Sequence, residues 1–83
     1  MTDTRRYEQI VTRDHADQVM SVILEIKSET DRWLVGVELD TDGTIKSGRG
    51  YDERVHVIDV GTITRRTPLV MNNHYARFEK AVD

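Results

Sequence analysis

The sequence predicts an α+β domain: an N-terminal amphipathic helix, a three- to four-stranded antiparallel meander and a C-terminal helix. Three observations lead to this prediction. Apolar residues recur at helical spacing in residues 14–28, they alternate with polar residues in residues 33–39, and asparagines that can cap a helix precede the last segment. With 83 residues the chain has room for one domain and not for two, so residues 1–83 are treated as a single domain.

The N-terminal part contains a weak candidate strand and a strong candidate helix. Residues 6–12 alternate imperfectly between apolar and polar side chains. Residues 14–28 place their apolar side chains on one broad arc at about 100° per residue, and Asp14 can cap the helix they predict. The alternative is a strand over residues 21–27, but Ile23 breaks its alternation. We therefore expect the helix.

Residues 33–39 have the most regular strand pattern in the chain. Four apolar residues share one face of this strand: Trp33, Val35, Val37 and Leu39. We expect Trp33 to be buried against the first helix. Asp42-Gly43 follows, and this pair suits the left-handed dihedral angles of a two-residue hairpin turn. A short return strand is expected over residues 44–47.

The second half of the chain predicts one more long strand and a helix. Residues 54–64 are rich in valine and isoleucine, but the phase of their alternation changes. Either both faces of this strand are covered, or a bulge near Asp59 and Gly61 shifts its register. Asn72 or Asn73 can cap a final helix that ends near Val82. The predicted sheet is either an open meander with both helices on one face or a small curled barrel of the SH3 or Sm type.

Charge and composition narrow the functional classes. The chain has 12 basic and 15 acidic side chains, a net charge of −3, which does not favour a dedicated duplex-binding protein. It contains no cysteine, which excludes disulfides, thiolate metal sites and a cysteine nucleophile. Neither a membrane-spanning run nor an export signal is apparent, so we expect a cytoplasmic protein that does not contact a membrane.

No motif predicts a metal, a cofactor or catalysis. Residues 38–45 match part of a calcium loop, but Arg49 occupies the position where calcium needs a bidentate carboxylate. Gly48-Arg49-Gly50 opens like a phosphate-binding loop, yet Glu53 replaces its third glycine. The histidines His15, His56 and His74 show no metal-ligand spacing, and the serines lie in no nucleophile motif. We expect no metal, no cofactor and no enzymatic activity.

A C-terminal patch is the best candidate for binding, because arginine, tyrosine and asparagine make directional contacts. Its residues are Arg65, Arg66, Asn72, Asn73, His74, Tyr75 and Arg77. Since a domain of this size supports only a limited core, we expect a small non-catalytic protein-interaction module that associates with itself, as a homodimer, or with another protein. The alternative is a nucleic-acid-binding domain that uses the arginines of this patch.

Overall fold

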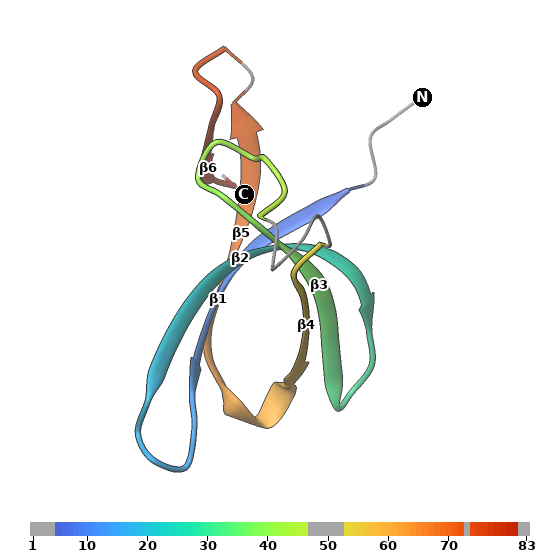
Figure 1. Ribbon diagram of the computed structural model, residues 1–83, viewed down its shortest axis with the longest axis vertical. Helices are drawn as coiled ribbons and strands as arrows, with labels where there is room; N and C mark the ends of the chain where they lie inside the picture. The colour runs from blue at the N-terminus through green and yellow to red at the C-terminus, as the bar shows by residue number, and fades with distance from the viewer. Residues whose placement is uncertain (1–4, 47–52, 73, 82–83) are drawn as a thin grey trace.

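One curved antiparallel sheet makes up the structure (Figure 1). The computed structural model describes residues 5–46, 53–72 and 74–81. The six strands are β1 (Arg6–Arg13), β2 (Val19–Glu29), β3 (Trp33–Leu39), β4 (Val55–Asp59), β5 (Ile63–Asn72) and β6 (Arg77–Lys80). A short 3₁₀ turn, η1 (Val60–Thr62), joins β4 to β5. The predicted α+β class is wrong, because the described residues contain no α-helix.

The strand order explains the curvature of the sheet. The strands lie side by side as β4-β3-β2-β1-β5-β6, so β5 pairs with the side of β1 that faces away from β2. In a flat sheet, β4 and β5 would be about 19 Å apart, which is four strand spacings. The link from Asp59 to Ile63 spans about 13 Å when fully extended. The sheet must therefore curl until the end of β4 lies close to the start of β5.

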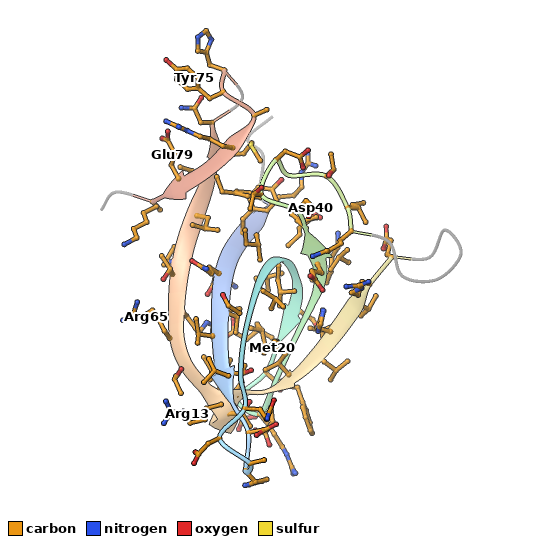
Figure 2. The ribbon with its side chains drawn as sticks, turned by 60° about the vertical axis from the view of Figure 1, so that its left-hand side comes forward. Arg13, Met20, Asp40, Arg65, Tyr75 and Glu79 are labelled. Carbon is orange, nitrogen blue, oxygen red and sulfur yellow. The ribbon has the colours of Figure 1, made fainter. Side chains whose placement is uncertain are left out.

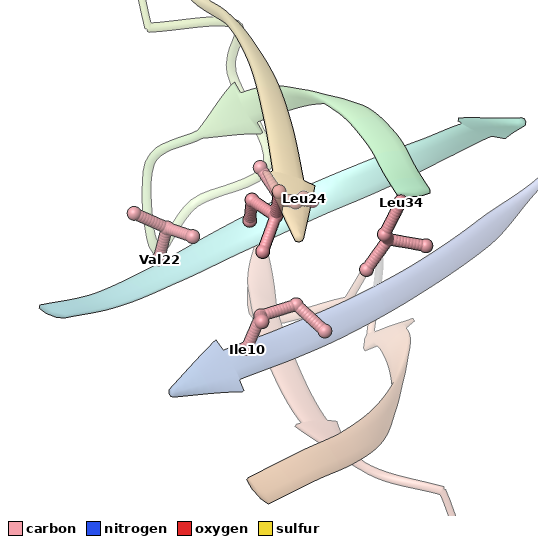
Figure 3. Packing of buried hydrophobic residues seen from close by; sticks show 5 residues of the cluster. Ile10, Val22, Leu24 and Leu34 are labelled. Atoms are coloured by element: carbon pink, nitrogen blue, oxygen red, sulfur yellow. The ribbon is translucent and has the colours of Figure 1, made fainter. Parts of the chain in front are cut away.

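The core fills the inner face of this curl (Figure 3). Its buried residues come from four strands: Ile10, Val22, Leu24, Leu34 and Ile58. Three further apolar residues pack against them: Ile26, Val60 and Ile63. Complete burial of a side chain such as Leu24 or Leu34 contributes about 1.5–3 kcal/mol. This small cluster is the main apolar support of the fold.

The predicted N-terminal helix is a turn followed by a strand. Residues 6–12 form a strand as predicted, and β2 contains the alternative strand over residues 21–27. The Asp14 carboxylate does act as a cap, but it accepts hydrogen bonds from the backbone N–H groups of Ala16 and Gln18, each at 2.9 Å, and so closes a hairpin turn. β2 pairs with both β1 and β3, and its β-branched side chains fit a pleated surface. These tertiary contacts outweigh the helical spacing.

The predicted C-terminal helix is a β-hairpin. The side-chain oxygen of Asn72 accepts from the backbone N–H groups of His74 and Tyr75, at 3.0 and 3.4 Å, as an N-cap would. The chain then reverses through Ala76, whose φ of 50° lies in the left-handed region, and enters β6. The ring of Phe78 packs on that of Tyr7, with centroids 5.1 Å apart. Asn73 and Val82 lie outside the described residues.

Two further expectations need correction. The predicted strand over residues 54–64 is interrupted by η1, and this turn, rather than a bulge, separates β4 from β5. Trp33 meets no α-helix in the described part of the chain and is 40% exposed, so the prediction of a buried tryptophan is wrong.

The turn at Asp42-Gly43 is present, with Gly43 at a φ of 88°, but it belongs to a three-residue loop. The Asp40 N–H donates to the Thr44 carbonyl at 2.8 Å across this loop. Among the described residues of the expected return strand, only an isolated bridge between Leu39 and Ile45 remains.

Candidate protein-interaction surface

The structure does not bring the predicted binding patch together (Figure 2). Arg65 and Arg66 are neighbours on β5, so their side chains point to opposite faces of the sheet. The other described members lie at the tip of the β5–β6 hairpin: Asn72, His74, Tyr75 and Arg77. Seven residues of strand, about 23 Å, separate this tip from Arg65. Asn73 is outside the described residues. The patch is thus two separate groups.

Arg66 is held inside an ion-pair network. Its Nε lies 2.8 Å from Glu8 Oε1, and its Nη1 lies 2.8 Å from Glu29 Oε2. Arg6 adds a second cation, with Nη2 2.8 Å from Glu8 Oε2. Hydrogen bonds to Glu29 and Glu8 raise the pKa of Arg66, and the hydrogen bond from Arg66 lowers the pKa of Glu29. Because two carboxylates bind this guanidinium, its role is to link β1, β2 and β5.

The hairpin tip is a small exposed aromatic and cationic group. The Arg77 guanidinium lies 5.0 Å from the centre of the Tyr75 ring, and the His74 ring meets Tyr75 edge-on at 4.7 Å. Arg77 also pairs with Glu79 at 3.3 Å. Tyr75 remains 62% exposed despite these contacts. The tip therefore brings together three residues of the predicted patch, His74, Tyr75 and Arg77, but not its two β5 arginines.

A second polar cluster lies on the inner face around Glu38. His56 Nε2 is 2.7 Å from Glu38 Oε1, and Lys46 Nζ is 3.3 Å from Glu38 Oε2. Burial raises the pKa of Glu38, but hydrogen bonds from His56 and Lys46 together lower it below its ordinary value. Asp59 faces the opposite side of β4 from His56, because the two residues are three positions apart on the strand. The described part of the chain contains no group of three or more histidine or carboxylate residues placed to hold a metal ion.

Sequence reasoning missed an apolar strip on the outer face of β3 and β4. Trp33, Val35 and Val57 share this face, because Val35 pairs with Val57 and Trp33 pairs with Asp59. Val55 extends the strip opposite Val37. Val57 is 63% exposed and Val55 is 56% exposed. Two valines and a tryptophan thus face solvent at one side of the sheet.

Within the described residues, no strand pairs with the outer side of the backbone next to this strip. Glu38 N–H donates to the Arg54 carbonyl at 2.9 Å, and Val60 N–H donates to the Arg32 carbonyl at 2.9 Å. In an antiparallel ladder, hydrogen-bonded pairs of residues alternate with pairs that are not hydrogen-bonded. Between these two bonds, His56 and Ile58 are therefore the β4 residues that hydrogen-bond with β3. The N–H groups of Val55, Val57 and Asp59 point away from β3, as do the carbonyls of Val55 and Val57. The Asp59 carbonyl accepts from the Thr62 hydroxyl at 2.7 Å. No described strand lies on that side, and Figure 2 shows β4, in pale yellow, along the outer side of the sheet.

The two edge strands of the sheet differ in their protection. β6 has four residues, and three of them are charged: Arg77, Glu79 and Lys80. Short length and charge are common means of preventing unwanted strand pairing. β4 has the sequence Val-His-Val-Ile-Asp, without lysine, proline or a bulge. Of the two edges, β4 is the one suited to bind another strand.

The chain matches no known family model, no curated protein and no solved structure. Within the described residues, no helix is long and apolar enough to cross a membrane. The candidate surface therefore rests on geometry alone.

The sequence did contain a signal for this surface. Val55 and Val57 have the opposite parity to Ile58 and Val60, so one pair must point away from the core. The interpretation that both faces of this strand are covered is wrong, because Val55 and Val57 are exposed. Which pair would be buried depended on β3, whose register with β4 could not be read from the sequence.

Proposed function

We propose that the chain is a small non-catalytic protein-interaction module that binds an extended segment of a partner along the free edge of β4. The observation that supports this most strongly is the row of outward-pointing N–H groups at Val55, Val57 and Asp59, together with the outward-pointing carbonyls of Val55 and Val57. Strand addition at such an edge gains affinity from backbone hydrogen bonds and specificity from alternate side chains. The exposed Val57 and Trp33 supply apolar contact area beside the hydrogen-bonded ladder.

The polar clusters support a binding role over a catalytic one. The pair of His56 and Glu38 has Lys46 and Arg54 as its charged neighbours, at 3.3 and 3.7 Å from the carboxylate. Such a cluster neutralises a carboxylate that is only 8% exposed. The absence of cysteine supports a cytoplasmic location as part of the same proposal.

Nucleic-acid binding has less support. Arg66 is engaged by Glu8 and Glu29. Arg65 lies near the start of β5, whereas Arg77 is on β6, opposite Asn72 at the other end of β5. These cations do not form one continuous basic surface, which a phosphate-binding protein needs. The hairpin tip, with Tyr75 and Arg77, is a second surface that a protein partner could contact.

The test is a capture experiment with two matched variants. Tagged wild-type chain, Val57→Lys and Val19→Lys serve as baits in native lysate supplemented with untagged chain, with and without nuclease. Val19 is 60% exposed on β2 and controls for adding a lysine at an exposed strand valine. A lysine on an edge strand opposes pairing, so Val57→Lys should lose at least about tenfold in affinity, or 1.4 kcal/mol. Val19→Lys should bind as the wild type does.

Two results would contradict the proposal. One is capture of the same partner by Val57→Lys at wild-type affinity. The other is capture that nuclease abolishes for every bait, which would support nucleic-acid binding instead. Circular dichroism of each bait verifies that the variants are folded.

A further inference from the structure

We infer that the strand that binds β4 is β4 of a second copy, paired antiparallel about a two-fold axis that passes through Val57. This inference rests on the proposed function, because it names the partner of the same edge. The resulting dimer would have one continuous sheet that crosses the interface between the two copies.

The charges at the ends of β4 favour an antiparallel partner with the same sequence. Arg54 precedes the strand and Asp59 ends it, with uncharged or titratable residues between them. An antiparallel copy places Arg54 of one chain near the Asp59 end of the other, with the two side chains on opposite faces of the sheet, and so keeps like charges apart. A parallel copy would instead bring like charges together at both ends. Both side chains keep their contacts within the chain: Arg54 with Glu38 at 3.7 Å, and Asp59 with the Gly61 N–H at 2.9 Å.

The length of β4 selects the register. In a two-fold pair centred on Val57, Val57 faces its own copy and Val55 faces Asp59 of the second copy. All three residues with outward-pointing N–H groups then pair, and the strand is used from end to end. The Asp59 carbonyl, which accepts from the Thr62 hydroxyl, would accept the Val55 N–H of the second copy through its other lone pair. If the register between the two copies shifts by two residues in either direction, one of these three residues has no partner within β4 of the second copy. Such a shift would also extend the pairing beyond the strand, toward Glu53 on one side or η1 on the other.

The side chains agree with this register. The two copies of Val57, the most exposed large apolar residue of the described chain, would cover each other on the outer face. Directly opposed side chains on one face of an antiparallel pair contact each other, so these two valines would pack together. On the inner face, His56 would lie opposite Ile58 of the second copy, which avoids placing two histidines side by side.

Disulfide trapping tests the inference, since the natural chain contains no cysteine. The variants are Val57→Cys, Val55→Cys and Val19→Cys, each at micromolar concentration with oxidised glutathione. Directly opposed residues of a hydrogen-bonded pair have Cα atoms about 5.5 Å apart, within reach of a disulfide. Pairing raises the local thiol concentration to about the millimolar range. Val57→Cys should therefore form covalent dimers about 100-fold faster than Val19→Cys.

The inferred register separates Val55 from its own copy by four residues, about 13 Å. Val55→Cys should therefore cross-link as slowly as Val19→Cys. Equal slow rates for all three variants would overturn the inference, and fast cross-linking of Val55→Cys would overturn its register. Sedimentation equilibrium of the wild type at the same concentration should give twice the mass of one chain, and the mass of one chain would also overturn it. The cross-linking and sedimentation results could overturn the inference while Val57→Lys still fails to capture a protein that the wild type captures. In that case the proposed function stands, with a different partner on β4.

Discussion

Arg66 and Arg65 show how two adjacent residues of one type have different roles. The side chain of Arg66 is 27% exposed and contacts two carboxylates, one of which, Glu8, is 8% exposed. Removing one partner of a buried ion pair is costly because the other charge remains without compensation. Arg65 lies on the opposite face and is exposed. The stability of the sheet should therefore depend on Arg66 and not on Arg65.

Substitution of these arginines tests that difference. Arg66→Ala should lower the free energy of unfolding by about 2–3 kcal/mol, less than the loss of a fully buried partner because the site is partly hydrated. Arg65→Ala should change it by less than about 0.5 kcal/mol. Urea denaturation measures both values. Equal effects of the two substitutions would show that the network around Glu8 does not stabilise the fold.

At the scale of elements, carboxylates with lowered pKa values tie strands together. Glu29 on β2 bonds to Arg66 on β5, and Glu38 on β3 bonds to His56 on β4. The pKa of each carboxylate lies below the ordinary value of 4.5. At pH values around and below 4.5, the unfolded chain therefore binds more protons than the folded one. Acid therefore favours unfolding of the sheet.

The lowered pKa values of Glu29 and Glu38 determine how the stability of the sheet should depend on pH. The contribution of these carboxylates to the free energy of unfolding should be fully present above about pH 5. It should be lost as the pH falls through 4.5 and below. Thermal unfolding at a series of pH values measures the loss. Glu29→Gln, which cannot titrate, should have a lower melting temperature at neutral pH and a shallower acid-induced decrease. An identical pH profile for the variant would contradict the role of Glu29.

The sequence predicted some elements better than others, for physical reasons. β1 and β3 were expected, and the turn around Gly43 was found from its Asp-Gly pair. β2 was misassigned because its apolar residues fit both a helical arc and an alternating strand, and only the ladders to β1 and β3 decide between them. Asn72 was recognised as a cap, but an asparagine side chain can close a turn as well as start a helix.

The candidate site was predicted only in part. The tip residues His74, Tyr75 and Arg77 do lie together, because they are close in sequence. Arg66 was counted with them, although its partners Glu8 and Glu29 are distant in the chain and no local pattern reveals them. The free edge of β4 is a property of the strand order, which the sequence pattern does not contain.

For the molecule as a whole, the small core and the open edge lead to the same expectation. Seven hydrophobic residues are buried among the described residues: Ile10, Val22, Leu24, Leu34, Val37, Leu39 and Ile58. A chain of this size buries a smaller fraction of its surface on folding than a larger domain does, so association adds useful stability by mass action. Pairing at β4 would cover the exposed valines and satisfy the outward backbone groups in one interface.

Amide hydrogen exchange, measured residue by residue by NMR at low and high protein concentration, tests the role of the β4 edge most directly. The amides of His56 and Ile58 bond to β3 and should be protected at both concentrations. The Val57 amide points away from β3. It should exchange rapidly at low concentration and become protected at high concentration, when a second strand occupies the edge. Rapid exchange of Val57 at both concentrations would contradict the account.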